Sequence, residues 1–294
     1  MRVFIQLRKA GALGALIVLL ASVRVAAPAD VAVQERIEQE IAKQERIYSS
    51  RGADVPSGYV TSRTLASYAG LLPSGFTGSL ARLGSSDRWL DIGAGRGQAI
   101  LDYYQCDAAP GAACTPAAGR ARAVAVSIED RRSDQWRQRA ASVGEDRIRY
   151  LFGKRMRDYS REELGTFRVI TDVYGGFTYT DDLSLFMHSV LEVLETGGDF
   201  YTLLHTVRLE DGKDDPQTPY VTEVVDAAGR DVTVCSWLKR ITCVDVVCES
   251  KSDWDTPTEL IHARKVCGNV WIPPTRLLEY ESGSPPGRRF QIER

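Results

Sequence analysis

The residues best suited to chemistry lie in residues 88–99, which read Arg-Trp-Leu-Asp-Ile-Gly-Ala-Gly-Arg-Gly-Gln-Ala. Asp91 follows a short apolar run, and three glycines then occupy every second position: Gly93, Gly95 and Gly97. Glycine accepts positive φ angles and lets a ligand approach the main chain without a Cβ in the way. A helix-like stretch begins directly behind the last glycine, and the free N–H groups at a helix start favour a polar or anionic ligand. The pattern predicts a buried strand, a ligand-binding glycine turn and a helix.

The spacing of the glycines separates two kinds of cofactor site. Nicotinamide and flavin binders favour G-x-G-x-x-G, whereas this turn is G-x-G-x-G with an acid two residues before its first glycine. It resembles the first motif of class I S-adenosylmethionine-dependent methyltransferases, in which the turn lies under the amino-acid half of the cofactor. The resemblance implies S-adenosylmethionine as cofactor, with Asp91, Gly93, Gly95 and Gly97 at its site. The alternative is a tight strand–helix connection without a ligand.

A second apolar strand is predicted over residues 122–128, and Glu129-Asp130 follow it. In the resembled family, an acid at this strand end accepts hydrogen bonds from the two ribose hydroxyls. The resemblance therefore assigns that role to Glu129, with Ser127 as the alternative position. An acid placed here only to face a helix dipole is the other interpretation.

The third and fourth strands are predicted over residues 147–152 and 167–171. The family often has an acid near the adenine ring after its third strand, but here Gly-Lys-Arg follows, which leaves adenine recognition unassigned. The fourth strand end of the family faces both the methyl donor and the acceptor, so Asp172 and Tyr174 are expected at the reacting centre. A simple turn role for Asp172 is the alternative.

The remaining core elements follow from periodicity. Apolar residues at helical spacing predict a helix that packs on a sheet: Leu183, Phe186, Met187, Val190, Leu191 and Leu194. Asp181 or Asp182 can cap its start, and a fifth strand is expected over residues 200–204. Residues 242–250 and 259–266 read as a closing antiparallel pair. The expected fold is a doubly wound α/β domain with a mostly parallel, seven-stranded sheet and a C-terminal antiparallel strand pair.

The first residues are typical of a secretory signal. A basic start precedes an apolar run over residues 10–23, and Ala-Pro-Ala supplies small residues before a cleavage point after Ala29. We therefore expect a signal peptide over residues 1–29, a secreted or periplasmic protein, and no stable membrane span after cleavage. An uncleaved membrane anchor is the alternative.

The rest of the chain divides into three predicted parts. Residues 30–80 are expected to form a helical cap, and in the resembled family such elements cover the cofactor. Tyr59, Tyr68 and Phe76 could serve in this way here, and a plain core role for these isolated aromatics is the alternative. Residues 81–272 form the methyltransferase-like domain. Residues 273–294 are expected to be a C-terminal tail, which should be poorly ordered from Glu281 onward.

Six cysteines, an even number, suit an oxidising compartment. Cys106 and Cys114 bracket an Ala/Gly/Pro-rich insertion that a local disulfide would hold together. The expected strand pairing puts Cys243 near Cys267 and Cys248 near Cys235, which favours those two disulfides, and free buried thiols are the alternative. A zinc site is the competing interpretation, but the chain contains no Cys-x-x-Cys and no close Cys/His cluster. No metal is therefore expected.

Composition indicates an ordinary globular protein, with 44% hydrophobic and 26% charged residues. The formal net charge is −2, and no basic stripe interleaved with aromatics appears, so a nucleic-acid partner is not expected. Methyl transfer requires an aligned acceptor and, where the acceptor carries a proton, a base. His205 follows the fifth strand, where such sheets open to their sites, and it is the one histidine that we would test as that base.

These patterns favour an exported S-adenosylmethionine-dependent methyltransferase with an unknown acceptor. The alternative from another class is a non-catalytic exported binding protein on the same fold. An aminopropyl transferase on this fold is a third hypothesis, although no dense acidic polyamine pocket is evident. Because the cofactor is made in the cytosol, an exported enzyme would have to obtain it elsewhere.

Overall fold

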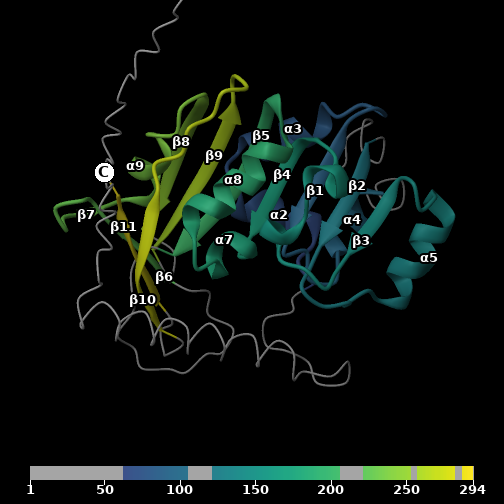
Figure 1. The fold of residues 1–294 in the computed structure, drawn as a ribbon. Coiled ribbons are helices and arrows are strands. Elements are labelled where there is room, and N and C mark those ends of the chain that lie inside the picture. The colour runs from purple at the N-terminus through teal and green to yellow at the C-terminus, as the bar shows by residue number, and fades with distance from the viewer. Residues whose placement is uncertain (1–61, 105–120, 206–220, 253–256, 282–286, 294) are drawn as a thin grey trace, which may run out of the picture.

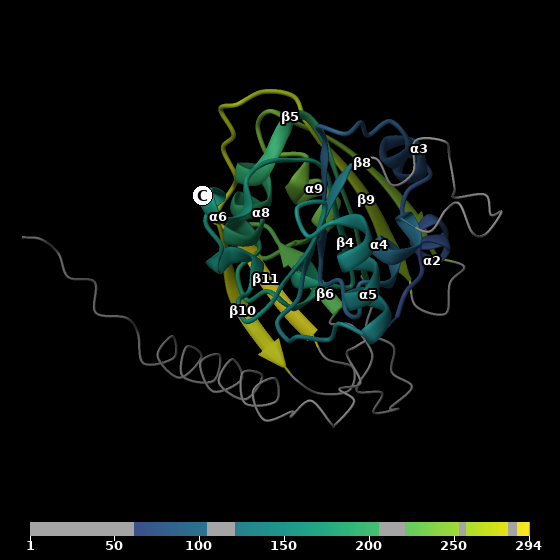
Figure 2. The same ribbon diagram turned by 90° about the vertical axis from the view of Figure 1, so that its right-hand side faces the viewer.

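A single twisted sheet organises the protein, with helices on both of its faces (Figure 1). The computed structural model describes residues 62–104, 121–205, 221–252, 257–281 and 287–293. In the view of Figure 2, α6 and α8 lie on one side of the strands, and α2, α4 and α5 lie on the other. The predicted signal peptide, the first part of the predicted cap and the Cys106–Cys114 pair lie outside the described residues.

The core of the sheet is a run of five parallel strands in the order β3-β2-β1-β4-β5. Their bounds are β1 (Arg88–Ile92), β2 (Arg122–Val126), β3 (Ile148–Leu151), β4 (Phe167–Val173) and β5 (Leu194–His205). Next to β5 lies β9 (Thr258–Lys265), which is antiparallel, and β9 pairs with the antiparallel edge strand β8 (Val244–Lys251). These seven strands confirm the predicted fold class, including its C-terminal antiparallel pair.

Two apolar clusters fill the space between this sheet and its helices. The helices are α2 (Leu65–Leu71), α3 (Gly75–Ala81), α4 (Gln98–Tyr103), α5 (Asp134–Val143), the 3-10 turn η1 (Met156–Asp158), α6 (Arg161–Leu164), α7 (Gly176–Tyr179), α8 (Leu183–Val193) and α9 (Val234–Leu238). One cluster contains the apolar residues of α8 and α9, and the other those of α2, α3 and α4. The Asp182 carboxylate caps α8 by accepting a hydrogen bond from the Leu185 N–H, as the sequence predicts.

Four further strands extend the sheet beyond the predicted seven: β6 (Val221–Val225), β7 (Asp231–Val232), β10 (Thr275–Glu281) and β11 (Gly287–Ile292). Beyond β5 the order is β6, β11, β10, and β11 runs parallel to β6. The expectation of poor order in the tail from Glu281 is therefore wrong for residues 287–292, which form β11. Alternate side chains of β11 are buried, namely Arg288, Phe290 and Ile292, so this strand contributes to the core.

Two disulfides fix the C-terminal part of the fold, and both pairings expected from the sequence are confirmed. Cys235 is bonded to Cys248, which ties α9 to β8. Cys243 is bonded to Cys267, which joins the start of β8 to the end of β9. Among the described residues, no helix is long and apolar enough to cross a membrane.

Removing the bridge between α9 and β8 should destabilise the protein. The Cys235–Cys248 bond spans 13 residues, so the double variant Cys235→Ala/Cys248→Ala should lose about 2–4 kcal/mol of unfolding free energy. Urea unfolding followed by circular dichroism in oxidising buffer measures the loss. The same comparison in dithiothreitol is the control, because there the difference between the two proteins should shrink. Equal urea midpoints in oxidising buffer would show that this bridge contributes nothing.

Candidate functional site

The predicted glycine turn follows β1 and has the backbone conformation that requires glycine. Gly93, Gly95 and Gly97 have φ angles of 70°, 54° and 74°. The N–H groups of Gly93 and Ala94 both donate to the Val126 carbonyl, at 2.9 and 3.1 Å, and these bonds tie the turn to the end of β2. Gly93 is exposed and Gly95 is partly exposed, so the main chain is open to a ligand at these two positions.

The third glycine serves packing. Gly97 is buried, and a Cβ there would lie 2.4 Å from Cζ3 of the Trp136 ring. Trp136, on α5, therefore covers this end of the turn. Of the three glycines, the structure leaves Gly93 and Gly95 as the positions that a ligand can touch.

Asp91, the acid before the turn, is fully buried. The Tyr68 hydroxyl on α2 contacts both of its oxygens at 3.1 Å, and the Thr171 hydroxyl donates to one at 2.8 Å. Burial raises the pKa of Asp91 to about 7, although these two hydrogen bonds lower it and the nearby Asp172 raises it further. The carboxylate thus joins the helical cap to the sheet, and it supports the turn from the interior.

Asp172, at the end of β4, is also fully buried. Its two oxygens accept hydrogen bonds from the N–H groups of Gly175 (2.9 Å) and Phe177 (3.0 Å). Burial raises the pKa of Asp172 to about 7, against these backbone hydrogen bonds and the charge of Arg288. Both oxygens therefore hold the backbone of the loop after β4. This is the turn role that was the alternative interpretation of Asp172 in the sequence.

Tyr174 is the residue of this loop that reaches the surface. It is partly exposed and has a φ of 52°, an uncommon conformation for a bulky residue. The Arg63 guanidinium lies over its ring, 5.1 Å from the centroid, and the His205 ring centroid is 4.9 Å from its own. Tyr174 therefore has a cation and an imidazole as immediate neighbours.

His205 is the last residue of β5, and its ring lies beside that of Tyr174. This is the strand end at which the sequence predicts the candidate base. Its Nδ1 is 3.0 Å from the Thr258 hydroxyl on β9, and the Thr258 side chain also hydrogen-bonds Tyr174. Burial lowers the pKa of His205 to about 4, so the imidazole is neutral at pH 7. A neutral imidazole keeps one ring nitrogen as an acceptor.

Glu129 lies in the loop after β2 with most of its side chain buried. Both of its carboxylate oxygens are buried. Oε2 forms an ion pair with Nη2 of Arg131, and Oε1 has no hydrogen-bond partner among the described residues. The Tyr150 hydroxyl lies within hydrogen-bond distance of the Gly95 and Glu129 carbonyls, at 2.5 and 3.3 Å. Glu129 is thus held next to the open part of the glycine turn.

Sequence reasoning missed two apolar side chains near Glu129. Ile128 is 39% exposed and Phe152 is 46% exposed. The Gly153 N–H donates to the Ile128 carbonyl at 2.9 Å, so the loops after β2 and β3 lie side by side. The signal was present in the sequence, because Phe152 follows β3 directly and Ile128 follows β2 after one serine, where a loop would ordinarily turn polar.

Solved structures share this architecture at low sequence identity. A ribosomal RNA methylase from Streptococcus thermophilus is 13% identical over 65% of this chain and 95% of its own, with a TM-score of 0.42. The glycopeptide N-methyltransferase MtfA, complexed with S-adenosyl-L-homocysteine, is 16% identical over 65% and 90%, with a TM-score of 0.40. A putative methyltransferase from Streptococcus mutans is 12% identical over 65% and 96%, with a TM-score of 0.41.

These proteins are named as methylases or methyltransferases, and the similarity to them concerns the fold alone. The resemblance to class I S-adenosylmethionine-dependent methyltransferases rests on the sequence motif of residues 91–97. No protein-family model and no curated protein matches the sequence.

The buried Asp91 should make stability depend on pH. Its pKa is raised on folding, so between about pH 4 and pH 7 the native protein holds a proton that the unfolded chain has lost. Stability from this group therefore falls as pH rises through that window. Asp91→Asn does not titrate, so its unfolding free energy relative to wild type should increase by up to about 1.4 kcal/mol per pH unit. Urea unfolding of both proteins at pH 5 and pH 7 gives this difference.

Tyr68→Phe is the companion variant, because it removes one donor from Asp91 and should raise the pKa of that carboxyl further. The unfolding free energies of Asp91→Asn and wild type should differ by different amounts at pH 5 and pH 7. If the difference is the same at both pH values, Asp91 does not bind a proton on folding and the prediction is wrong.

Proposed function

We propose that this protein is an S-adenosylmethionine-dependent methyltransferase of unknown acceptor. The observation that carries the proposal is the buried Glu129 carboxylate beside the glycine turn: one of its oxygens contacts Arg131, and the other has no hydrogen-bond partner among the described residues. A buried polar atom without a partner is costly and calls for an explanation. Two acceptor atoms on one carboxylate match two adjacent ribose hydroxyls.

The surroundings of Glu129 support a nucleoside at this position. The exposed Gly93 and partly exposed Gly95 offer bare main chain for the amino-acid half of the cofactor. Ile128 and Phe152 offer exposed apolar surface for the flat face of the adenine ring. The residues present therefore fit S-adenosylmethionine, with Glu129 on the ribose and these two side chains beside the base.

Bound S-adenosylmethionine supplies a methyl group that is already activated on its sulfonium. The chain's own task is then to hold the acceptor in line and to take a proton from it where it carries one. Tyr174 and His205 are placed for this task at the ends of the adjacent strands β4 and β5. The neutral His205 imidazole would accept the proton, with Thr258 fixing the orientation of its ring.

The location of the protein is part of the proposal. The signal-like first residues and the two disulfides support export to an oxidising compartment, either secreted or periplasmic. A non-catalytic exported binding protein on this fold is the second candidate. The low pKa of His205 favours it, because a histidine with a pKa of about 4 is a weak base at neutral pH.

Calorimetry of the oxidised protein with S-adenosylmethionine and S-adenosylhomocysteine tests the cofactor assignment. Glu129→Gln should weaken both by about 10- to 100-fold, because each hydrogen bond to a charged group contributes about 1.5–3 kcal/mol. Asp130→Asn is the matched control, since that carboxylate is already paired with Arg132, and its affinity should stay close to wild type. No binding of either compound at millimolar concentration would refute the proposal. Formation of S-adenosylhomocysteine with a periplasmic or host extract separates the enzyme from the binding protein.

A further inference from the structure

Three arginines from separate strands gather at one edge of the sheet. Arg88 and Arg122 are the first residues of β1 and β2, and they lie directly opposite each other in the parallel register. Arg149 lies on β3 opposite Val124, which is two residues beyond Arg122 on β2. Side chains alternate between the two faces of a sheet, so these three arginines, the arginine cluster, project from the same face. They come from three separate parts of the sequence, and the strand register brings them together.

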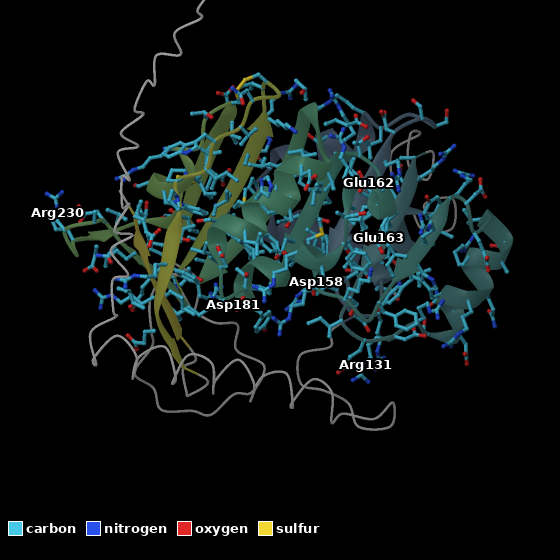
Figure 3. The ribbon with its side chains drawn as sticks, viewed as in Figure 1. Arg131, Asp158, Glu162, Glu163, Asp181 and Arg230 are labelled. Carbon is cyan, nitrogen blue, oxygen red and sulfur yellow. A yellow bond between two sulfur atoms is a disulfide. The ribbon has the colours of Figure 1, made fainter. Side chains whose placement is uncertain are left out.

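The arginine cluster lies at the end of the strands that is opposite the candidate site. Arg88 begins β1, whereas the glycine turn follows Ile92, the last residue of that strand. In Figure 3, Arg131, which lies in the loop after β2, is on the lower side of the molecule, so β2 ends toward that side and begins away from it. A ligand held by the arginine cluster would therefore leave the glycine turn free.

Arg88, the central member of the cluster, is held in a fixed position. Its guanidinium lies 4.4 Å from the centroid of the Phe167 ring, and its Nη1 donates to the Thr166 carbonyl at 3.4 Å. A Cβ on Gly165 would overlap the same Nη1, so the loop before β4 is shaped around this guanidinium. An arginine has five N–H donors, and the Thr166 carbonyl accepts from one of them. Arg88 is thus positioned in advance for a further acceptor.

The charges of the arginine cluster are not neutralised by neighbouring carboxylates. Among the described residues, none of the three arginines forms an ion pair. Burial and the charges of Arg149 and Arg122 lower the pKa of Arg88, and Glu195 is the acid whose charge raises it. The Glu195 carboxylate accepts a hydrogen bond from the Thr166 hydroxyl at 3.1 Å. Like charges on neighbouring strands repel each other, and a bound anion would relieve this repulsion.

We propose that the arginine cluster binds a terminal phosphate group, as found in a phosphomonoester or in pyrophosphate. Such a group carries up to two negative charges at neutral pH. The planar fork of a guanidinium matches two phosphate oxygens at once, which favours arginine over lysine at a site of this kind. Arg88 provides the fixed donor, and the exposed Arg122 and Arg149 complete the site from the adjacent strands. This site does not depend on the proposed function, because it lies at the other end of the strands.

Calorimetric titration with pyrophosphate tests the site. The double variant Arg122→Gln/Arg149→Gln should bind pyrophosphate at least about 10-fold more weakly than wild type, because two charged donors are lost. Both side chains are exposed, and removing like charges should leave the thermal unfolding midpoint unchanged or higher in the absence of ligand. Arg240→Gln is the matched control, since this exposed arginine lies on the turn after α9, and its affinity should stay close to wild type. Titration of the same samples with S-adenosylhomocysteine should give the same affinity in the double variant and in wild type.

The phosphate could belong to a free compound or to a lipid headgroup, and vesicle sedimentation distinguishes these sources. If wild type sediments with equal parts of phosphatidic acid and phosphatidylcholine but not with phosphatidylcholine alone, and the double variant does not sediment, the source is a lipid. If wild type binds pyrophosphate but neither kind of vesicle, the source is a free phosphate compound, and both results support the site. If wild type binds neither pyrophosphate at millimolar concentration nor the acidic vesicles, or if Arg240→Gln weakens binding as much as the double variant, the proposal is wrong. A failure to bind S-adenosylhomocysteine would refute the proposed function and leave this site unaffected.

Discussion

The close approach of two main-chain segments, at Gly93 and Gly175, fixes the geometry of the whole site. A Cβ on Gly93 would lie 2.4 Å from the Gly175 Cα, and a Cβ on Gly175 would lie 2.4 Å from the Ile92 carbonyl oxygen. No side chain fits between these loops. Because β1 and β4 are parallel neighbours in register, both loops leave the same edge of the sheet and meet there. Tyr174, directly before Gly175, takes its left-handed conformation as part of this turn.

Two buried carboxylates lie on the interior side of these loops, and each accepts hydrogen bonds from a different set of donors. Asp91 uses side-chain hydroxyls from Tyr68 and Thr171, and so links the cap to the sheet. Asp172 uses the N–H groups of its own loop. Burial raises the pKa of both to about 7, and the charge of Asp172 raises the pKa of Asp91 further. Asp91 and Asp172 thus have structural hydrogen-bond partners for their carboxylate oxygens, whereas Glu129 has one buried oxygen without a hydrogen-bond partner among the described residues.

The features of the fold that depend on local residue spacing could be predicted from the sequence. The glycine turn, the strand ends, the α8 cap and two disulfides follow from periodicity, turn residues and the pairing of one hairpin. The features that the sequence did not predict depend on contacts between residues that are far apart in the chain. Tyr68 meets Asp91 only after α2 packs on the sheet, and Ile128 lies beside the loop after β3 only through the β2–β3 register. The same reason explains why β11 was missed, because its parallel partner β6 lies more than 60 residues earlier.

The C-terminal extension is connected to the site through one buried cation. Arg288 of β11 is fully buried and donates to the Thr180 carbonyl and the Thr222 hydroxyl. Thr180 follows α7, the helix whose start is held by Asp172, and the charge of Arg288 lowers the pKa of that same carboxyl. The hydrogen bond from Arg288 to the Thr180 carbonyl joins β11 directly to the end of α7, and the one to Thr222 joins it to β6. The added strands are therefore connected to the segment that begins at the loop after β4, the loop that carries Tyr174.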